Sequence, residues 1–178
     1  MKKKSQFSNF LFFMRDLMSE DLFISLRKYC KGDILDIGGW DFYETIIKKK
    51  VTYKTWTVLE SDKTHLSEPK QRDVRCIHGD GCNLEFKNNA FDTVVCIQVL
   101  EHVFEPLKLF KESVRVLKKG GYGIFMVPQT GNLHGVPHHY QNFTKFWIIE
   151  VCKTEKVELI ELIPTGGAWS THASRLLH

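Results

Sequence analysis

The sequence lacks the features by which several classes of protein are recognised. Its five cysteines are odd in number and form no C-x-x-C pair, which excludes a zinc finger or a disulfide framework and favours free thiols in a reducing compartment. We therefore expect a cytoplasmic protein. No apolar run is long enough to span a membrane, and the first one ends at Arg15 and Asp16, too early for a secretory signal.

The sequence also lacks a large excess of positive or negative charge. The 25 Lys and Arg against 21 Asp and Glu leave a net charge of +4, too small and too dispersed to indicate nucleic acid as a partner. Apolar residues, in contrast, make up 43% of the 178 residues, enough for one core that needs neither disulfide nor metal. We expect a single domain over residues 1–178, with an N-terminal helix or lid at 1–30, a core at 31–128 and a C-terminal region at 129–178.

Strands and helices alternate in the predicted order of elements. Short apolar runs that end in turn residues predict strands, and apolar residues spaced three and four apart predict helices. The predicted strands span 33–37, 55–59, 74–77, 91–97, 122–127 and 157–163, and the helices span 7–29, 41–50, 106–119 and 143–152. This alternation predicts an α/β fold, a Rossmann-like, doubly wound, mostly parallel sheet with helices on both faces, whose ligand lies at the carboxyl ends of the strands.

Acidic and polar residues follow the first four predicted strands. In chain order they are Asp36 with Gly38 and Gly39, Glu60, Asp80 with Gly81, and Gln98 with Glu101 and His102. A glycine turn followed by an acid about 20 residues later is the arrangement that binds a dinucleotide. However, the Asp36 carboxylate would repel a pyrophosphate, and Trp40 and Phe42 stand where further glycines would admit phosphates. A cofactor with ribose, adenine and positive charge but no phosphate fits better, and S-adenosylmethionine is such a cofactor.

With these motifs the chain resembles the class I S-adenosylmethionine-dependent methyltransferases, in particular the small-molecule group. The resemblance is carried, in order, by Asp33–Gly39, Val58–Glu60, His78–Leu84, Phe91–Val103 and Val114–Gly121. It implies a seven-stranded sheet with a reversed last strand. It also places Gly38 and Gly39 beside the methionine part of the cofactor, Glu60 on its ribose and Asp80 on its adenine. Asp36, Gly81, Gln98 and His102 complete the cofactor site that we expect.

A structural role stays open for several of these residues. Asp36 would also serve as the cap of the helix near Asp41, Glu60 as a solvated strand end, and Asp80 as an ordinary turn residue. His102 either bonds a backbone carbonyl or acts at the site. The family usually has a glycine where Trp40 stands, so we expect the turn to follow a different path.

Histidines after the fifth predicted strand are the candidates for catalysis. His134, His138, His139 and Tyr140 lie on a loop that the sheet would bring to the same crevice, and methyl transfer needs an aligned acceptor and one general base. His138 or His139 is the base that we predict. We expect no metal, because no cysteine or carboxylate lies at ligand spacing among these histidines.

Absent motifs narrow the acceptor. The chain reads Cys96-Ile97-Gln98-Val99-Leu100 after the fourth strand, without the Asn/Asp-Pro-Pro-aromatic motif of related nucleic-acid methylating enzymes, and it has no Pro-Cys pair. We therefore expect methyl transfer to a small metabolite or glycan precursor. A non-catalytic methyltransferase-like binding module and, further from the pattern, a nucleotide-dependent oxidoreductase are the alternatives.

The two ends of the chain give two further expectations. The N-terminal helix, which carries Lys2 to Lys4 and an aromatic face, is a lid over the cleft or, alternatively, a peripheral contact with an anionic membrane. No second apolar β run follows residues 157–163. We therefore expect an incomplete or altered C-terminal edge of the sheet, as in a truncated chain.

Overall fold

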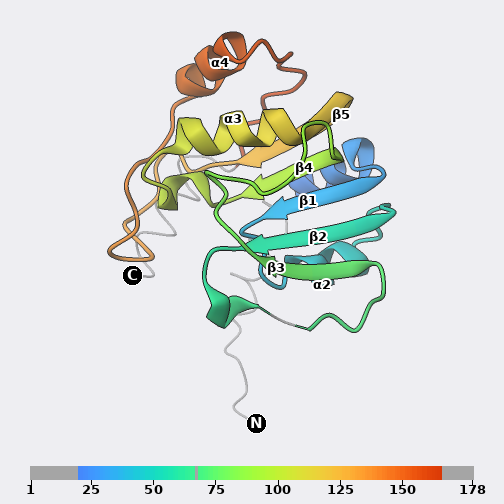
Figure 1. Cartoon of the computed structure of the whole chain (residues 1–178). Coiled ribbons are helices and arrows are strands. Elements are labelled where there is room, and N and C mark those ends of the chain that lie inside the picture. The colour runs from blue at the N-terminus through green and yellow to red at the C-terminus, as the bar shows by residue number, and fades with distance from the viewer. Residues whose placement is uncertain (1–19, 67, 166–178) are drawn as a thin grey trace, which may run out of the picture.

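The protein is built around a parallel sheet whose strands all end at one edge. The computed structural model describes residues 20–66 and 68–165. Within them the sheet has five strands in the order β3-β2-β1-β4-β5, and every neighbouring pair is parallel. The strands are β1 (Asp33–Ile37), β2 (Thr55–Glu60), β3 (Val74–His78), β4 (Phe91–Ile97) and β5 (Leu117–Met126). The predicted doubly wound α/β fold is confirmed (Figure 1).

Side chains of β1 show how both faces of the sheet are buried. Successive residues of a strand point to opposite faces, so Ile34 and Leu35, both fully buried, enter two separate cores. Ile34 packs with the helical segment 20–29 and with α2 (Phe42–Lys48), whereas Leu35 packs with α3 (Pro106–Val116). A strand covered on both faces needs a continuous apolar run, which is why the sequence reveals it.

The boundary between α3 and β5 differs from the prediction. The helix ends at Val116, and Leu117 already pairs with Phe91 of β4, so Gly120 and Gly121 lie inside β5 and not beyond a longer helix. The register shifts between Phe91 and Thr93, which identifies the glycine pair as part of an irregularity in the strand. Pairing with β4 therefore overrides the helical spacing of the preceding residues.

The C-terminal part contains a helix but no strand. Thr144 caps α4 (Lys145–Thr154) by accepting a hydrogen bond from the Trp147 amide, close to the predicted helix at 143–152. Val151 and Cys152 pack on Phe110 of α3. The strand predicted at 157–163 is wrong, because this segment joins no sheet and leaves its apolar side chains partly exposed. An apolar run becomes a strand only when a neighbour pairs with its backbone.

The described residues thus carry five parallel strands, without the two further strands that the resemblance implies. This agrees with the expected altered C-terminal edge. Of the predicted N-terminal helix at 7–29, residues 20–29 are helical and the rest, with Lys2 to Lys4, lies outside the described residues. None of the five cysteines, all of which lie in the described residues, forms a disulfide. Among the helices that the structure describes, none is long and apolar enough to cross a bilayer.

Candidate functional site

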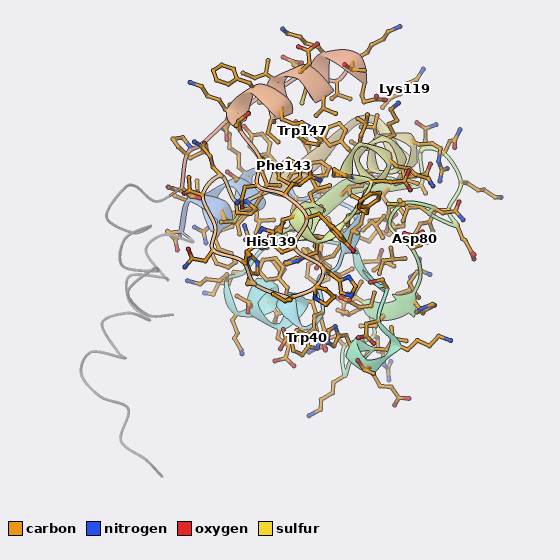
Figure 2. All side chains as sticks on the ribbon, turned by 90° about the vertical axis from the view of Figure 1, so that its left-hand side faces the viewer. Trp40, Asp80, Lys119, His139, Phe143 and Trp147 are labelled. Carbon is orange, nitrogen blue, oxygen red and sulfur yellow. The ribbon has the colours of Figure 1, made fainter. Side chains whose placement is uncertain are left out.

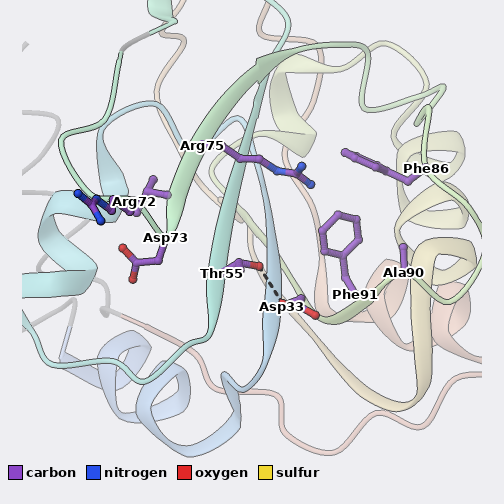
Figure 3. A pocket seen from close by; sticks show the side chains of 9 residues that line it. Asp33, Thr55, Arg72, Asp73, Arg75, Phe86, Ala90 and Phe91 are labelled. Atoms are coloured by element: carbon purple, nitrogen blue, oxygen red, sulfur yellow. Dashed lines mark hydrogen bonds between the residues drawn. The ribbon is translucent and has the colours of Figure 1, made fainter.

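Two pockets lie at opposite edges of the sheet. One of about 360 Å³ lies at the amino ends of β1, β2 and β3 (Figure 3). Its polar side chains include pairs that bond each other or the sheet: Thr55 donates to Asp33 at 2.9 Å, and Arg75 donates to Thr57 at 2.8 Å. In open α/β sheets the ligand binds at the carboxyl ends of the strands, so the other pocket is the candidate site.

The second pocket, of about 320 Å³, is formed by the carboxyl ends of β1, β2 and β3 together with the turn after β4. Of the predicted cofactor residues it is lined by Gly38, Asp80, Gly81 and His102. Apolar side chains of Ile37, Leu59, Val99 and Leu109 also line it. Figure 2 looks onto this edge, with Trp40, Asp80 and His139 around it. Apolar walls with a few polar groups are typical of a cofactor pocket.

Asp36 lies beneath the glycine turn and does not line the pocket. Its side chain is 1% exposed, and the Trp56 indole donates a hydrogen bond of 3.0 Å to its Oδ2, while Oδ1 has no hydrogen-bond partner. Burial raises the pKa of this carboxyl to about 7, against the lowering effect of the Trp56 hydrogen bond. The carboxylate occupies the position that a Cβ added to Gly39 would take, so Asp36 packs directly against the turn. Asp36 does not cap α2.

Glu60 is held against the same turn. The residue is only 5% exposed, and its carboxylate accepts a hydrogen bond of 2.5 Å from the Trp40 backbone amide. Burial raises the pKa of Glu60, and the Trp40 amide opposes that rise. The adjacent Leu59 and Ser61 line the pocket, whereas Glu60 itself does not. Its burial beside the turn shows that it is not a solvated strand end.

The turn keeps a glycine-like backbone although a tryptophan stands in it. Trp40 has a φ of 44°, in the left-handed region that glycine favours and that costs other residues about 1–2 kcal/mol. Its ring stacks on His65 with centroids 4.6 Å apart. This stacking and the hydrogen bond from the Trp40 amide to Glu60 help to offset the backbone strain at Trp40. The backbone conformation at Trp40 is therefore one that a glycine would readily adopt. The different path of the turn stays a prediction.

Substitution of Gly38 would show whether the turn excludes a side chain for steric reasons as well as for its left-handed backbone. Both Gly38 (φ 68°) and Gly120 (φ 73°) are left-handed, but only at Gly38 would a Cβ meet a neighbour, Val99 Cγ2 at 2.6 Å. We expect Gly120→Ala to lower the free energy of unfolding by about 1 kcal/mol and Gly38→Ala by more than about 2 kcal/mol. Urea unfolding of the two variants measures this. Equal losses would show that Val99 imposes no steric limit.

The loop after β3 combines a turn with the pocket wall. Asp80 Oδ1 accepts the Cys82 amide at 2.8 Å, the bond of an Asx turn, and the side chain is exposed at the pocket. A Cβ on Gly81 would lie 2.9 Å from Leu109 and 3.1 Å from Ile37. Asp80 therefore shapes the turn and also lines the pocket, and its contact with adenine stays a prediction.

Gln98 has a different position from the other predicted cofactor residues. It is exposed and has a φ of 56°, and its backbone amide donates a hydrogen bond of 2.9 Å to the Met126 carbonyl oxygen. It is not one of the residues that line the pocket. The turn that follows it carries Glu101, which is fully buried and whose two carboxylate oxygens have no hydrogen-bond partner. Burial raises the pKa of Glu101, and the neighbouring His102 opposes that rise.

Three histidines surround this buried acid. The ring centroids of His102, His134 and His139 are 4.5–5.6 Å apart. His138 instead places its ring beside Tyr140, with Nδ1 3.1 Å from the hydroxyl. The fold therefore brings His139 into the group and leaves His138 beside it. The sequence placed Glu101 among the acids that follow the strands but did not predict its burial, because burial cannot be read from two adjacent residues.

Comparisons with known proteins agree with this geometry. Residues 48–125 match the family model described as a methyltransferase domain. An S-adenosylmethionine-dependent methyltransferase of Aquifex aeolicus has the same fold, with a TM-score of 0.64 at 15% identity over 83% of both chains. Residues 48–125 are thus similar to a methyltransferase domain, and the described part of the chain has the fold of such proteins. The pocket lies at the edge of the sheet where the motifs of the resemblance lie.

Other proteins that resemble this chain carry names of different activities. A 2-methyl-6-phytyl-1,4-hydroquinone methyltransferase of Oryza sativa subsp. japonica is 26% identical over 147 residues, which cover 79% of this chain and 43% of the rice protein. The chain therefore spans less than half of that protein. The cyclase SpnF shares the fold, with a TM-score of 0.65 at 20% identity over 82% of this chain and 57% of its own. A shared fold alone does not fix the reaction.

Proposed function

We propose that this methyltransferase binds S-adenosylmethionine in the pocket at the carboxyl ends of β1, β2 and β3 and transfers its methyl group to a small organic acceptor. The observation that carries the proposal is the buried Glu60 carboxylate, held by the Trp40 amide between two residues, Leu59 and Ser61, that line the pocket. Such a carboxylate can accept two hydrogen bonds from a ribose diol without ordering a flexible side chain first. When bound, the cofactor supplies an electrophilic methyl group on a positively charged sulfur.

The remaining pocket residues fit the other parts of this cofactor. Gly38 and Gly81 lack side chains at positions where a Cβ would meet Val99 or Leu109, and Leu59, Val99 and Leu109 offer apolar contacts to a flat base. Asp80 lies where the exocyclic amino group of adenine would find an acceptor. Asp36 and Gly39 support the turn, and in this proposal His102 closes the pocket on the β4 side, while Gln98 stays a proposed cofactor residue outside the lining.

The proposed acceptor is a small metabolite or glycan precursor bound beside the histidines. Exposed apolar side chains surround them: Phe104 and Leu133 are each 78% exposed and Val136 is 77% exposed. Apolar side chains beside polar groups favour an acceptor with an apolar portion as well as a reactive heteroatom or carbon. The name of the rice relative describes such an acceptor, a hydroquinone with a phytyl chain, for that protein.

For catalysis we retain the histidine loop. Proximity supplies much of the acceleration in such a displacement, and a base is needed only to take the acceptor's proton. His139 lies beside the buried Glu101, whereas His138 contacts Tyr140. We therefore keep both His138 and His139 as the proposed candidates for the base. The five free cysteines support a reducing, cytoplasmic environment, and we propose neither nucleic acid nor a membrane as the acceptor.

Calorimetric titration of the full chain with S-adenosylmethionine, S-adenosylhomocysteine and NAD tests the proposal. We expect both sulfur compounds to bind with one site per chain and NAD not to bind, because the acids around the turn disfavour a pyrophosphate. Binding of neither sulfur compound at millimolar concentration would favour a non-catalytic binding module. Binding of NAD alone would favour an oxidoreductase.

A further inference from the structure

The group formed by Glu101, His102, His134 and His139 contains a buried charge without a partner. Glu101 is fully buried and neither of its carboxylate oxygens has a hydrogen bond. Leaving a carboxylate in this state is costly, since buried charges are normally paired, hydrogen-bonded or bound to a metal. Two ring nitrogens lie near it, His102 Nε2 at 3.9 Å and His134 Nε2 at 4.0 Å from Glu101 Oε1.

Both histidines are oriented with a free nitrogen toward that carboxylate. His102 Nδ1 lies 2.8 Å from the His138 carbonyl oxygen, and His134 Nδ1 lies 2.8 Å from the Asn132 carbonyl oxygen. A carbonyl oxygen only accepts, so each Nδ1 is the donor and each Nε2 has its lone pair available in the neutral ring. Metal-binding histidines are held in the same way, by donating their other nitrogen to a carbonyl or carboxylate.

From this arrangement we propose that Glu101, His102 and His134 form a binding site for a divalent transition-metal ion such as Zn²⁺. Their ligand atoms lie within 4.8 Å of one another. Around Zn²⁺, with bonds of about 2.1 Å, tetrahedral ligands are roughly 3.4 Å apart, so small rotations of the side chains would close the site. Two imidazoles and one carboxylate suit Zn²⁺ or Fe²⁺ and leave at least one coordination position open.

His139 lies beside the proposed metal site and can donate a hydrogen bond to a ligand at the open coordination position. Its Nδ1 accepts the His134 amide at 3.2 Å, so its Nε2 carries the hydrogen in the neutral ring, and this Nε2 is buried without a partner. An oxygen bound to the metal would supply the missing acceptor. Because His102 also lines the cofactor pocket, that oxygen would be water or, if the proposed function holds, an oxygen of the methyl acceptor.

The fold, and not the sequence spacing, assembles this group. The tight turn after β4 buries Glu101, the Tyr140 amide donates to the Glu101 carbonyl at 2.8 Å, and Gly135 leaves room for the His102 ring, which a Cβ would approach to 3.0 Å. A metal was not expected from the sequence because no acid lies near His134, His138 and His139 along the chain. The acid comes from another loop.

Zn²⁺ titration of the full chain by calorimetry tests the site. We expect one Zn²⁺ per chain, a rise in the melting temperature with Zn²⁺, and a loss of affinity of more than about 100-fold in His134→Ala and in Glu101→Gln. His134 is an exposed loop residue, so its variant should fold even if Glu101→Gln does not. His78→Ala, which removes an exposed histidine of β3 outside the group, is the matched control and should bind Zn²⁺ as the parent does.

X-ray absorption of the Zn²⁺ complex should show nitrogen and oxygen ligands without sulfur, which excludes binding at the free thiols. The proposal is overturned if no saturable one-to-one binding occurs, if both variants bind as tightly as the parent, or if sulfur ligands appear. Equal affinity for Mg²⁺ would overturn the assignment to a transition metal. Cofactor binding is measured in the same variants, so that loss of the metal site and failure of the proposed function are seen separately.

Discussion

Replacement of Asp36 by asparagine should remove a large pH dependence of stability. In the folded protein burial raises the pKa of Asp36 to about 7, against an ordinary value of 3.8. Between these two values the folded state holds a proton that the unfolded state has lost, so the free energy of unfolding falls as the pH rises from about 4 to 7. A difference of three pKa units corresponds to a loss on the order of 4 kcal/mol.

We therefore expect the parent and Asp36→Asn to have similar stability near pH 4, and Asp36→Asn to be the more stable by a few kcal/mol at pH 8. Asparagine can still accept the Trp56 hydrogen bond, so the change removes the charge and little else. Urea unfolding at pH 4, 6 and 8 without added cofactor or metal measures the difference. Asp41→Asn, at an exposed carboxyl five residues away, is the control. A stability difference that does not change with pH would contradict the buried charge of Asp36.

Glu60 to glutamine should weaken cofactor binding by roughly tenfold to 150-fold. Hydrogen bonds to a charged acceptor contribute about 1.5–3 kcal/mol, and 1.4 kcal/mol corresponds to a factor of ten. Glutamine keeps the size of the side chain and can still accept the Trp40 amide, so the turn should remain in place. Calorimetric titration with S-adenosylmethionine measures the loss.

Two comparisons make the Glu60 result specific. Glu44→Gln removes one carboxylate from the exposed face of α2 and should leave the affinity unchanged. If Glu60 binds the ribose, S-adenosylhomocysteine, which has the same ribose but no sulfonium charge, should lose the same factor. A loss confined to S-adenosylmethionine would place Glu60 near the sulfur. Unchanged affinity for both compounds would remove Glu60 from the site.

The strands that frame the pocket could be predicted because their burial is visible in the sequence. β1 and β4 are covered on both faces, so they appear as short apolar runs that stop at turn residues. The predicted ends of these runs at Ile37 and Ile97 coincide with the strand ends in the structure. Since the carboxyl ends of parallel strands meet at one edge, the predicted position of the pocket followed from the order of the elements.

Predictions that depended on a partner in space were less accurate. Lys118 and Lys119 continue a helical pattern, yet they join β5 because the edge of β4 is available for pairing. The apolar run at 157–163 has strand composition but meets no such edge. In both places the local pattern was correctly described and the choice between helix, strand and coil depended on what lay beside it.

The sequence by itself determined the parallel α/β sheet, the methyltransferase motifs at its carboxyl edge and the candidate residues Gly38, Glu60 and Asp80. These depend on apolar periodicity and on the position of turn residues, both of which are local. Only the tertiary structure placed Glu101 without a partner among His102 and His134. Two loops far apart in the chain have to be packed together before a buried charge and its neighbours exist, and no spacing within either loop contains that information.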